Sequence, residues 1–268
     1  MLSGETRLVG LLGFPLSHSL SPRMQNAAFA ARGLDWTYVP LPVEPGSLEA
    51  AAAGLVALGF AGANVTIPHK TALVAYCDEL DEVAERAGSV NTLVVRDGRL
   101  LGSSTDGAAV VEQVDAGDAD VLVLGAGGAA QAVATALVEA GCSSLRVAAR
   151  NAERAQALAA RLVTLFPERD VGADTWPPAL IPDLLVNATP VGDEALVEPE
   201  RRMQVVDLAY NADGRPTALV ATARQRGCEV VVDGLDVLVA QGAASFERWT
   251  GVLAPVEVMR TAVRSLSP

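Results

Sequence analysis

Hydrophobic and polar positions along the chain follow two alternating patterns, one of short buried strands and one of helices. Short apolar runs rich in Val, Leu and Ala are separated by longer stretches with helical periodicity. This alternation predicts an α/β fold with mainly parallel strands. In the first part of the chain we expect strands at 7–13, 36–41 and 61–67 and helices at 21–32 and 47–57. Further helical segments should follow the third strand as far as about residue 86.

The pattern continues with a hairpin and then with a second α/β series. Residues 90–95 and 99–102 predict two strands joined at Asp97-Gly98, a pair typical of tight hairpin turns. From Asp120 onward, short apolar strands again alternate with helices, and two helices close the chain. We expect strands at 121–124, 145–149, 184–187, 204–208 and 230–232, and helices at 128–140, 152–165, 216–226, 237–249 and 255–266.

Length and pattern together predict two domains. A chain of 268 residues is long enough for two modest domains. The two series of strands divide near residue 106, so we expect a first domain over 1–106 and a second over 107–234.

Composition and charge narrow the classes of function. Hydrophobic residues make up 50% of the chain, and the net charge of −12 argues against a nucleic-acid-binding protein, which concentrates positive charge. The sequence shows neither an apolar run as long as a membrane span nor the pattern of a signal peptide. Three scattered cysteines and two histidines predict no disulfide framework and no metal site. We therefore expect a cytoplasmic protein that binds neither nucleic acid nor a membrane.

A glycine-rich turn follows the strand predicted at 121–124 and opens the next helix. Its sequence fits the G-x-G-x-x-A form of the dinucleotide-binding fingerprint. The first glycine permits a tight turn, the second lets the backbone approach a pyrophosphate, and the helix N-terminus offers free N–H groups. The alternative is a glycine turn that only serves packing. We predict that the cofactor contacts the residues Gly125, Ala126, Gly127, Gly128 and Ala129.

The end of the following strand discriminates between cofactors. An NAD site usually carries an acid there, which binds the ribose 2′-hydroxyl. Here the strand ends in Arg150-Asn151, and Arg154 follows one turn later. Two guanidinium groups suit a 2′-phosphate, so the sequence predicts NADP. The alternative is that both arginines are solvated residues at the start of a helix.

Two polar segments in the first domain are not explained by secondary structure. Ser19 and Ser21 lie on one side of an extended turn, where paired hydroxyls near a helix start can hold a carboxylate. The alternative for Ser21 is a capping role, with Pro22 at the first helical position. Lys70 follows a strand end, where α/β proteins bind ligands, and is either a proton donor or a surface ammonium group. We interpret its neighbour His69 as structural.

Two further segments carry an amide and a carboxylate. Asn91 stands at the head of a predicted strand, and Asp106 directly precedes a predicted helix. From the residue pattern alone, Asp106 is better interpreted as an N-cap than as a catalytic group.

Jointly, these segments resemble the shikimate dehydrogenase family over almost the whole chain. The resemblance is carried by the glycine turn and by Ser19-Leu20-Ser21-Pro22, Asn64-Val65-Thr66-Ile67-Pro68-His69-Lys70, Gly88-Ser89-Val90-Asn91-Thr92, Thr105-Asp106-Gly107, Asn187-Ala188-Thr189 and Asp233-Gly234 leading to Gln241. The resemblance implies an N-terminal substrate domain, completed by residues 235–268, and a Rossmann-type NADP-binding domain, with a cleft between them.

The resemblance also implies roles for individual residues. Lys70 and Asp106 would form the catalytic pair, and Ser19 and Ser21 would bind the substrate carboxylate. The ring hydroxyls would be held by Thr66, Asn91, Asp106, Tyr210 and Gln241, and the nicotinamide would lie near Thr189, Leu208 and Gly234.

The implied activity is the reversible NADP-dependent reduction of 3-dehydroshikimate to shikimate, in aromatic amino-acid biosynthesis. One alternative is a dehydrogenase of broader specificity that also accepts quinate. Another is a non-catalytic NADP-binding regulator on the same fold, against which the presence of both Lys70 and Asp106 argues. Monomers and homodimers both occur in the family, and the sequence does not choose between them.

Overall fold

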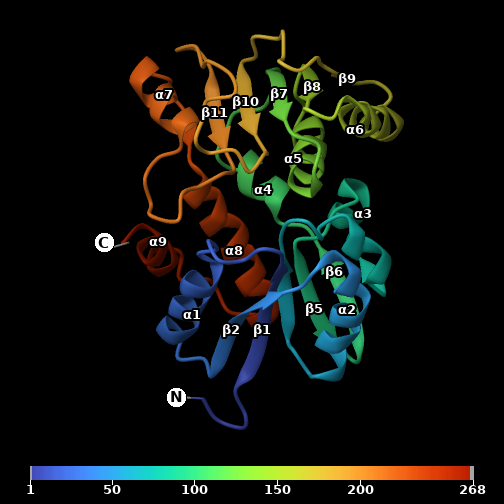
Figure 1. The fold of residues 1–268 in the computed structure, drawn as a ribbon, viewed down its shortest axis with the longest axis vertical. Helices are drawn as coiled ribbons and strands as arrows, with labels where there is room; N and C mark the ends of the chain where they lie inside the picture. The colour runs from blue at the N-terminus through green and yellow to red at the C-terminus, as the bar shows by residue number, and fades with distance from the viewer. Residues whose placement is uncertain (1, 266–268) are drawn as a thin grey trace. The chain divides into compact units, whose positions relative to one another are not determined.

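The computed structural model describes residues 2–265 and divides into two compact units (Figure 1). The first consists of Met1–Thr105, Ala212–Gly214 and Leu238–Pro268, and the second of Asp106–Asn211 and Arg215–Val237. Each unit contains its own six-stranded sheet, which confirms the predicted α/β fold.

The sheet of the first unit is mixed and has the strand order β2-β1-β3-β5-β6-β4. Its strands are β1 (Arg7–Gly13), β2 (Trp36–Pro42), β3 (Gly62–Val65), β4 (Glu79–Leu80), β5 (Thr92–Arg96) and β6 (Arg99–Ser103). The first three strands are parallel, and β5 runs antiparallel to both β3 and β6. The predicted hairpin is confirmed, because Asp97 and Gly98 both have the positive φ of a tight turn, 53° and 72°.

Helices cover both faces of this sheet. They are α1 (Ser21–Ala31), α2 (Leu48–Ala57), α3 (Glu82–Ala87), α9 (Val256–Arg264), the part of α8 (Gly234–Thr250) from Leu238 onward, and the 3-10 helices Pro45–Ser47 and Ala72–Tyr76. On one face, Leu48 and Leu55 of α2 join Leu12 and Leu93 of the sheet in one apolar core. Elsewhere in the unit, α1 stacks on α8 through Phe29 and Phe246, whose ring centroids are 5.3 Å apart.

The sheet of the second unit is entirely parallel, with the order β12-β11-β10-β7-β8-β9. Its strands are β7 (Asp120–Leu124), β8 (Ser144–Ala148), β9 (Asp170–Ala173), β10 (Leu184–Asn187), β11 (Gln204–Asp207) and β12 (Val231–Val232), and its helices include α4 (Asp106–Val111), α5 (Gly128–Glu139), α6 (Ala152–Leu165) and α7 (Ala218–Arg226). Counted from β7, this is the 3-2-1-4-5-6 order of a dinucleotide-binding sheet, in reverse. The order changes direction between β7 and β10, which is where such sheets bind ligands.

Four sequence predictions of local structure need correction. The sequence did not reveal β9, an edge strand whose short segment Asp-Val-Gly-Ala lacks an apolar run. The helical stretch predicted up to residue 86 is interrupted by β4, and the third strand ends at Val65 rather than at residue 67. The last predicted helix, 255–266, ends at Arg264, and Leu266 lies outside the described residues.

None of the helices in the described part of the chain is long and apolar enough to span a membrane.

Candidate functional site

A buried amide, Asn64, organises the carboxyl ends of the central strands in the first unit. It lies on β3 and is 4% exposed. The hydroxyl of Tyr38 donates to its Oδ1 over 2.9 Å, while its Nδ2 donates to the Asn91 carbonyl over 3.0 Å and to Oγ of Ser245 over 2.9 Å. Asn64 therefore ties together β2, the residue before β5, and α8.

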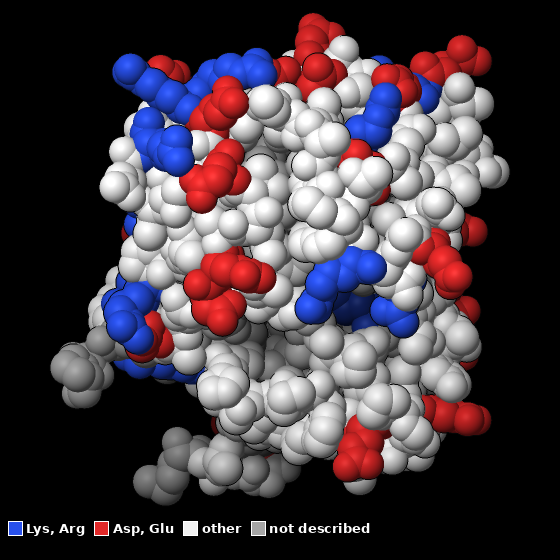
Figure 2. Space-filling view, turned by 45° about the horizontal axis from the view of Figure 1, so that its top comes forward, with Lys and Arg blue, Asp and Glu red and all other residues white. Residues whose placement is uncertain are grey.

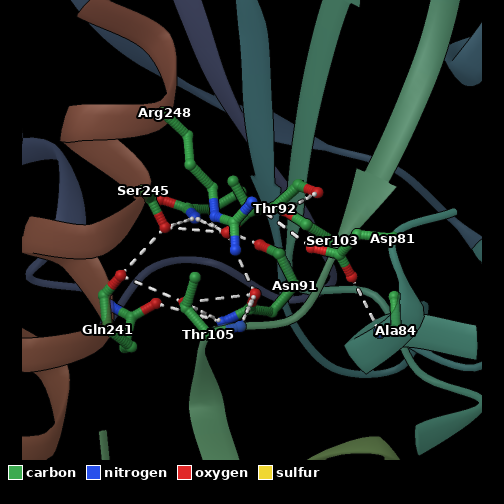
Figure 3. Close-up of polar contacts among 10 residues, drawn as sticks. Asp81, Ala84, Asn91, Thr92, Ser103, Thr105, Gln241, Ser245 and Arg248 are labelled. Atoms are coloured by element: carbon green, nitrogen blue, oxygen red, sulfur yellow. Dashed lines mark hydrogen bonds and ion pairs between the residues drawn. The ribbon is translucent and has the colours of Figure 1, made fainter. Parts of the chain in front are cut away.

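Asn91 and Thr105 form the next layer of this network, which Figure 3 shows together with residues of α8. Oδ1 of Asn91 accepts from the backbone N–H of Thr105 over 2.9 Å, and its Nδ2 donates to Oγ1 of Thr105 over 2.9 Å. The same Nδ2 lies 3.4 Å from Oε1 of Gln241, and Oγ1 of Thr105 donates to the Gln241 carbonyl over 3.1 Å. The structure thus brings together two residues predicted to hold ring hydroxyls, Asn91 and Gln241.

Local backbone geometry places the segment that contains Asn91. Asp81 caps α3 by accepting from the N–H of Ala84 over 2.8 Å, and Gly88 ends the helix in the left-handed conformation, with φ 62°. This turn is available at little cost only to glycine. The chain then enters residues 89–92, which lie in the site.

Lys70 is fixed beside this segment through its backbone. Its carbonyl accepts from the N–H of Val90 over 2.9 Å, and Thr66, four residues earlier, donates its N–H to the Leu12 carbonyl over 2.8 Å. Lys70 is also the only lysine in the sequence. The ring of His69 is 1% exposed, with Nε2 2.6 Å from the Val43 carbonyl, so the proton is on Nε2 and His69 has a structural role.

The capping interpretation of Ser21 is wrong. Helix α1 begins at Ser21 itself, Leu20 occupies the N-cap position, and no side chain makes a capping hydrogen bond there. Oγ of Ser19 instead accepts from the N–H of Ser21 over 3.3 Å. The hydroxyl of Ser21 is therefore not committed to capping, and both serines stand at a helix start, where an anion is favoured.

Asp106 is also not an N-cap, because it is the first residue of α4 and lies within its first turn. It is 4% exposed and directly follows Thr105. The next residue, Gly107, packs against α5 so closely that a Cβ would lie 2.8 Å from the carbonyl oxygen of Ala132. Only glycine allows this approach, which sets the position of α4 and hence of the Asp106 backbone.

In the second unit, the glycine turn lies where the strand order changes direction. Gly125 has φ +108°, and a Cβ there would lie 3.1 Å from the carbonyl oxygen of Ala188 and 3.3 Å from Cγ2 of Thr189. The turn after β7 is therefore in contact with the turn after β10. At Gly127, by contrast, a Cβ would meet no atom within 4 Å. This open space beside the backbone fits the approach of a pyrophosphate.

The N-terminus of α5 fits the same ligand. Its N-cap, Gly127, offers no side-chain hydrogen bond, and its first turn contains no acidic residue. Helices α6 and α7 of the same unit differ, because Asn151 accepts from the N–H of Arg154 over 2.9 Å and Thr217 accepts from the N–H of Val220 over 3.3 Å. The free N–H groups of α5 are the donors that bind phosphate in dinucleotide sites.

The predicted 2′-phosphate residues follow β8. Arg150 and Arg154 are exposed, and neither guanidinium group makes an ion pair with any residue that the structure describes. Asn151 uses its Oδ1 as the cap of α6, so its remaining donor is the side-chain Nδ2. Two exposed cations and no acid at this strand end suit a phosphate better than a ribose hydroxyl.

The residues predicted to lie near the nicotinamide are grouped at neighbouring strand ends. Oγ1 of Thr189 donates to Oδ1 of Asn187 over 2.7 Å, and the N–H of Leu208 donates to the Asn187 carbonyl over 2.8 Å. Gly234 packs directly on the backbone of Ala209, leaving no room for a Cβ. The three predicted residues Thr189, Leu208 and Gly234 therefore surround the ends of β10, β11 and β12. Tyr210 follows two residues after Leu208 and is partly buried.

Sequence reasoning missed one carboxylate of this region. Asp207, the last residue of β11, is fully buried, and its burial raises the pKa to about 6, although hydrogen bonds from Thr217, Ala209 and Asn187 lower it again in part. A usable signal was present in the sequence, since an acid ends the apolar run Val205-Val206 beside a strand that ends in Asn187.

The surface charges are mixed. On the face drawn in Figure 2, basic and acidic side chains form small separate clusters among neutral residues. Within residues 2–265, no group of three or more His, Cys, Asp or Glu residues is arranged to hold a metal ion.

Comparisons with known proteins point to one family. Three family models match the chain: the shikimate dehydrogenase substrate binding domain over residues 11–93, shikimate/quinate 5-dehydrogenase over 108–168, and the shikimate 5′-dehydrogenase C-terminal domain over 234–264. Among curated proteins, a shikimate dehydrogenase (NADP⁺) of Moorella thermoacetica is 46% identical over 98% of this chain and 94% of its own length.

Solved structures show the same likeness. A shikimate dehydrogenase in complex with NADP⁺ matches with a TM-score of 0.91 and 36% identity, covering 100% of this chain and 98% of the other. The shikimate 5-dehydrogenase of Thermus thermophilus, in complex with NADP(H) and shikimate, matches with a TM-score of 0.83 and 34% identity, covering 97% and 100%.

Proposed function

Because the chain belongs to the shikimate dehydrogenase family, we propose that it reduces 3-dehydroshikimate to shikimate with NADPH, reversibly, in aromatic amino-acid biosynthesis. The observation that carries the proposal is the network of Asn91, Thr105 and Gln241, which presents side-chain amides beside the backbone of Lys70. Residues 1–106 with 235–268 would form the substrate domain, and residues 107–234 the NADP-binding domain.

Binding of the substrate uses two kinds of group. The hydroxyls of Ser19 and Ser21 hold the carboxylate, supported by the positive end of α1. The ring hydroxyls are held by neutral donors and acceptors and one carboxylate, namely Thr66, Asn91, Tyr210, Gln241 and Asp106. The amide of Asn91 is held by Thr105 on both its oxygen and its nitrogen, so its orientation is set before the substrate binds.

Catalysis in this proposal depends on Lys70 and Asp106. When bound, NADPH supplies the hydride for the ring ketone. The ammonium group of Lys70 stabilises the negative charge that develops on the ketone oxygen and gives a proton to it, which completes the alcohol. The amine left on Lys70 regains its proton from solvent, and the carboxylate of Asp106 orients the Lys70 side chain and one ring hydroxyl. In the reverse direction Lys70 accepts the proton.

The cofactor is held by the backbone of the glycine turn and by the arginines after β8. The open space at Gly127 and the free N–H groups of α5 accommodate the pyrophosphate, with Ala126, Gly128 and Ala129 completing the turn. Arg150, Arg154 and Nδ2 of Asn151 bind the 2′-phosphate. Thr189, Leu208 and Gly234 place the nicotinamide.

Quinate is the second candidate substrate, because one matching family model covers shikimate and quinate enzymes together. Quinate carries one hydroxyl more than shikimate and lacks its ring double bond; we propose shikimate as the main substrate and compare the two directly. The same proposal places the enzyme in the cytoplasm, and a homodimer is the assembly to test by measuring its mass in solution.

The deciding experiment is an assay of shikimate-dependent NADP⁺ reduction, followed by the absorbance of NADPH. We expect turnover with shikimate and NADP⁺. The value of kcat/KM should be lower when NAD⁺ replaces NADP⁺ and when quinate replaces shikimate. An absence of NADPH formation at saturating shikimate, with a protein that still binds NADP⁺, would overturn the proposed activity.

A further inference from the structure

The carboxylate of Asp207 has no part in the mechanism above, although it is fully buried beside the proposed nicotinamide residues. A buried carboxylate is retained in a fold only where donors compensate for its lost hydration. Asp207 has three such donors, and each belongs to a different segment of the second unit.

The first donor controls the turn after β10. Nδ2 of Asn187 donates to Oδ1 of Asp207 over 2.8 Å, and the same Nδ2 donates to the Val191 carbonyl over 3.1 Å. Oδ1 of Asn187 in turn accepts from the N–H of Thr189 over 3.0 Å and from its hydroxyl over 2.7 Å. Asp207 and the Val191 carbonyl thereby both hold the Asn187 amide with its oxygen toward Thr189.

The other two donors control the turn after β11 and the start of α7. The N–H of Ala209 donates to Oδ1 of Asp207 over 3.0 Å, which holds the backbone next to Leu208. The hydroxyl of Thr217, the N-cap of α7, donates to Oδ2 over 2.5 Å. The charge of Asp233 opposes ionisation of Asp207, and Asp233 is itself paired with Arg224 over 3.2 Å.

We propose that Asp207 is a positioning residue that holds the nicotinamide end of NADP(H), by joining the turn that carries Thr189 to the turn that carries Leu208. The inference rests on the cofactor site of the proposed function. An acceptor with two oxygens suits this place, because all three neighbouring groups are donors. Asp207 does not touch the adenosine side of the site, so its effect should be confined to the nicotinamide end.

The test compares Asp207→Asn with a matched control, Asp183→Asn. Asp183 lies at the opposite, amino end of β10, where its carboxylate accepts from the N–H of Asp120 over 3.1 Å and pairs with Arg202. The two variants therefore lose the same charge from the same sheet. For each, we would measure the Kd of NADPH and of adenosine 2′,5′-bisphosphate, which lacks the nicotinamide. The kinetic isotope effect with deuterated NADPH would be measured as well.

We expect Asp207→Asn to weaken the binding of NADPH about tenfold. This is the effect of losing one hydrogen bond to a charged acceptor. The Kd of the fragment should stay unchanged, and the isotope effect on kcat should rise because hydride transfer becomes slower. Asp183→Asn should change neither the ratio of the two Kd values nor the isotope effect.

Two outcomes for Asp207→Asn would overturn the inference. An equal loss of affinity for NADPH and for adenosine 2′,5′-bisphosphate would indicate a general structural role, and no loss of affinity for either ligand would indicate no role. If the wild-type protein binds NADPH but does not oxidise shikimate, the proposed activity fails, and the comparison of the two ligands still decides the role of Asp207.

Discussion

In the first unit the candidate site consists of side chains that hydrogen-bond one another. In the second unit the glycine turn instead leaves backbone N–H groups and the space beside them open to a ligand. Asn64 and Asn91 have their amides committed to neighbouring residues in the described structure. Gly127 has open space beside it, and α5 lacks a side-chain cap. A ring with several hydroxyls needs donors and acceptors in fixed directions, but a pyrophosphate needs only access to backbone N–H groups. Substitutions should therefore damage the two sites in different ways.

The largest effect should follow from Lys70→Ala. We expect kcat to fall by at least ~100-fold, the usual scale of acid–base catalysis, while the Kd of NADP⁺ stays nearly unchanged. Lys70→Arg keeps the charge but does not supply the proton, so it should restore little of the lost rate. Unchanged turnover in Lys70→Ala would remove Lys70 from the mechanism.

The single lysine of the chain allows an independent check of the same residue. A reagent that modifies amines can react only at Lys70 and at the N-terminus. Modification of Lys70 should abolish activity, and saturating shikimate should protect against it. Modification that stops activity at the same rate with and without shikimate would contradict a substrate-site position.

A smaller effect should follow from Gly127→Val, which fills the open space beside the glycine turn. We expect a loss of about 10–100-fold in NADP⁺ affinity, because phosphate hydrogen bonds are lost, with a smaller loss in the free energy of unfolding than a substitution of Gly125 causes, since valine at Gly127 meets no clash and only replaces a better N-cap residue. The KM of shikimate should hardly change. Calorimetric binding and urea unfolding measure the two quantities.

Gly125→Ala is the matched comparison, because its backbone has φ +108° and a Cβ would press on Ala188. This variant should lose about 1–3 kcal/mol of stability in addition to cofactor affinity. If the two glycine variants lost equal stability, the distinction between open space and backbone strain would be wrong.

Arg150→Ala tests whether the protein prefers NADP⁺, with its 2′-phosphate, to NAD⁺, with its ribose 2′-hydroxyl. We expect the KM of NADP⁺ to rise about tenfold, because one charge-assisted hydrogen bond is lost. The KM of NAD⁺ should be unchanged, since NAD⁺ has no 2′-phosphate. A parallel rise for both cofactors would show that Arg150 contacts another part of the dinucleotide.

The smallest effect concerns the pH dependence of stability at Asp207. Burial raises the pKa of this carboxyl from 3.8 to about 6 in the folded protein, so the folded state binds the proton more tightly than the unfolded chain. The wild-type protein should therefore lose stability from this group as the pH rises through about 6, and Asp207→Asn should not. The stability of Asp207→Asn relative to wild type should be more favourable at about pH 7.5 than at about pH 5, by ~1 kcal/mol, in urea unfolding.

Sequence reasoning succeeded where the signal was local. The apolar runs located the strands at 7–13 and 184–187, and the glycines after β7 marked a turn between a strand and a helix; the contact of this turn with a cofactor stays a prediction. The arginines after β8 are equally visible in the sequence, since no acid stands at that strand end, and their role at a 2′-phosphate also stays a prediction.

The remaining features depend on contacts between residues far apart in the chain. Gln241 lies beside Asn91 only because α8 packs on the sheet of the first unit, 150 residues away in sequence. Asp207 acquires its role from donors on three separate segments, and no short motif records such a convergence. The interpretation of Ser21 as an N-cap failed because the helix begins at Ser21 itself and Leu20 occupies the N-cap position, a shift of one residue that the sequence pattern does not reveal.

The uncapped start of α5 has a consequence for the protein without its cofactor. Within residues 2–265 no side chain accepts from the first N–H groups of this helix, which therefore bond solvent until a phosphate binds. We expect the opening turn of α5 to exchange its amide hydrogens quickly in the apoprotein and slowly once NADP⁺ is bound. The dinucleotide then takes the place of a helix cap. Because it binds only the folded protein, it should also raise the melting temperature.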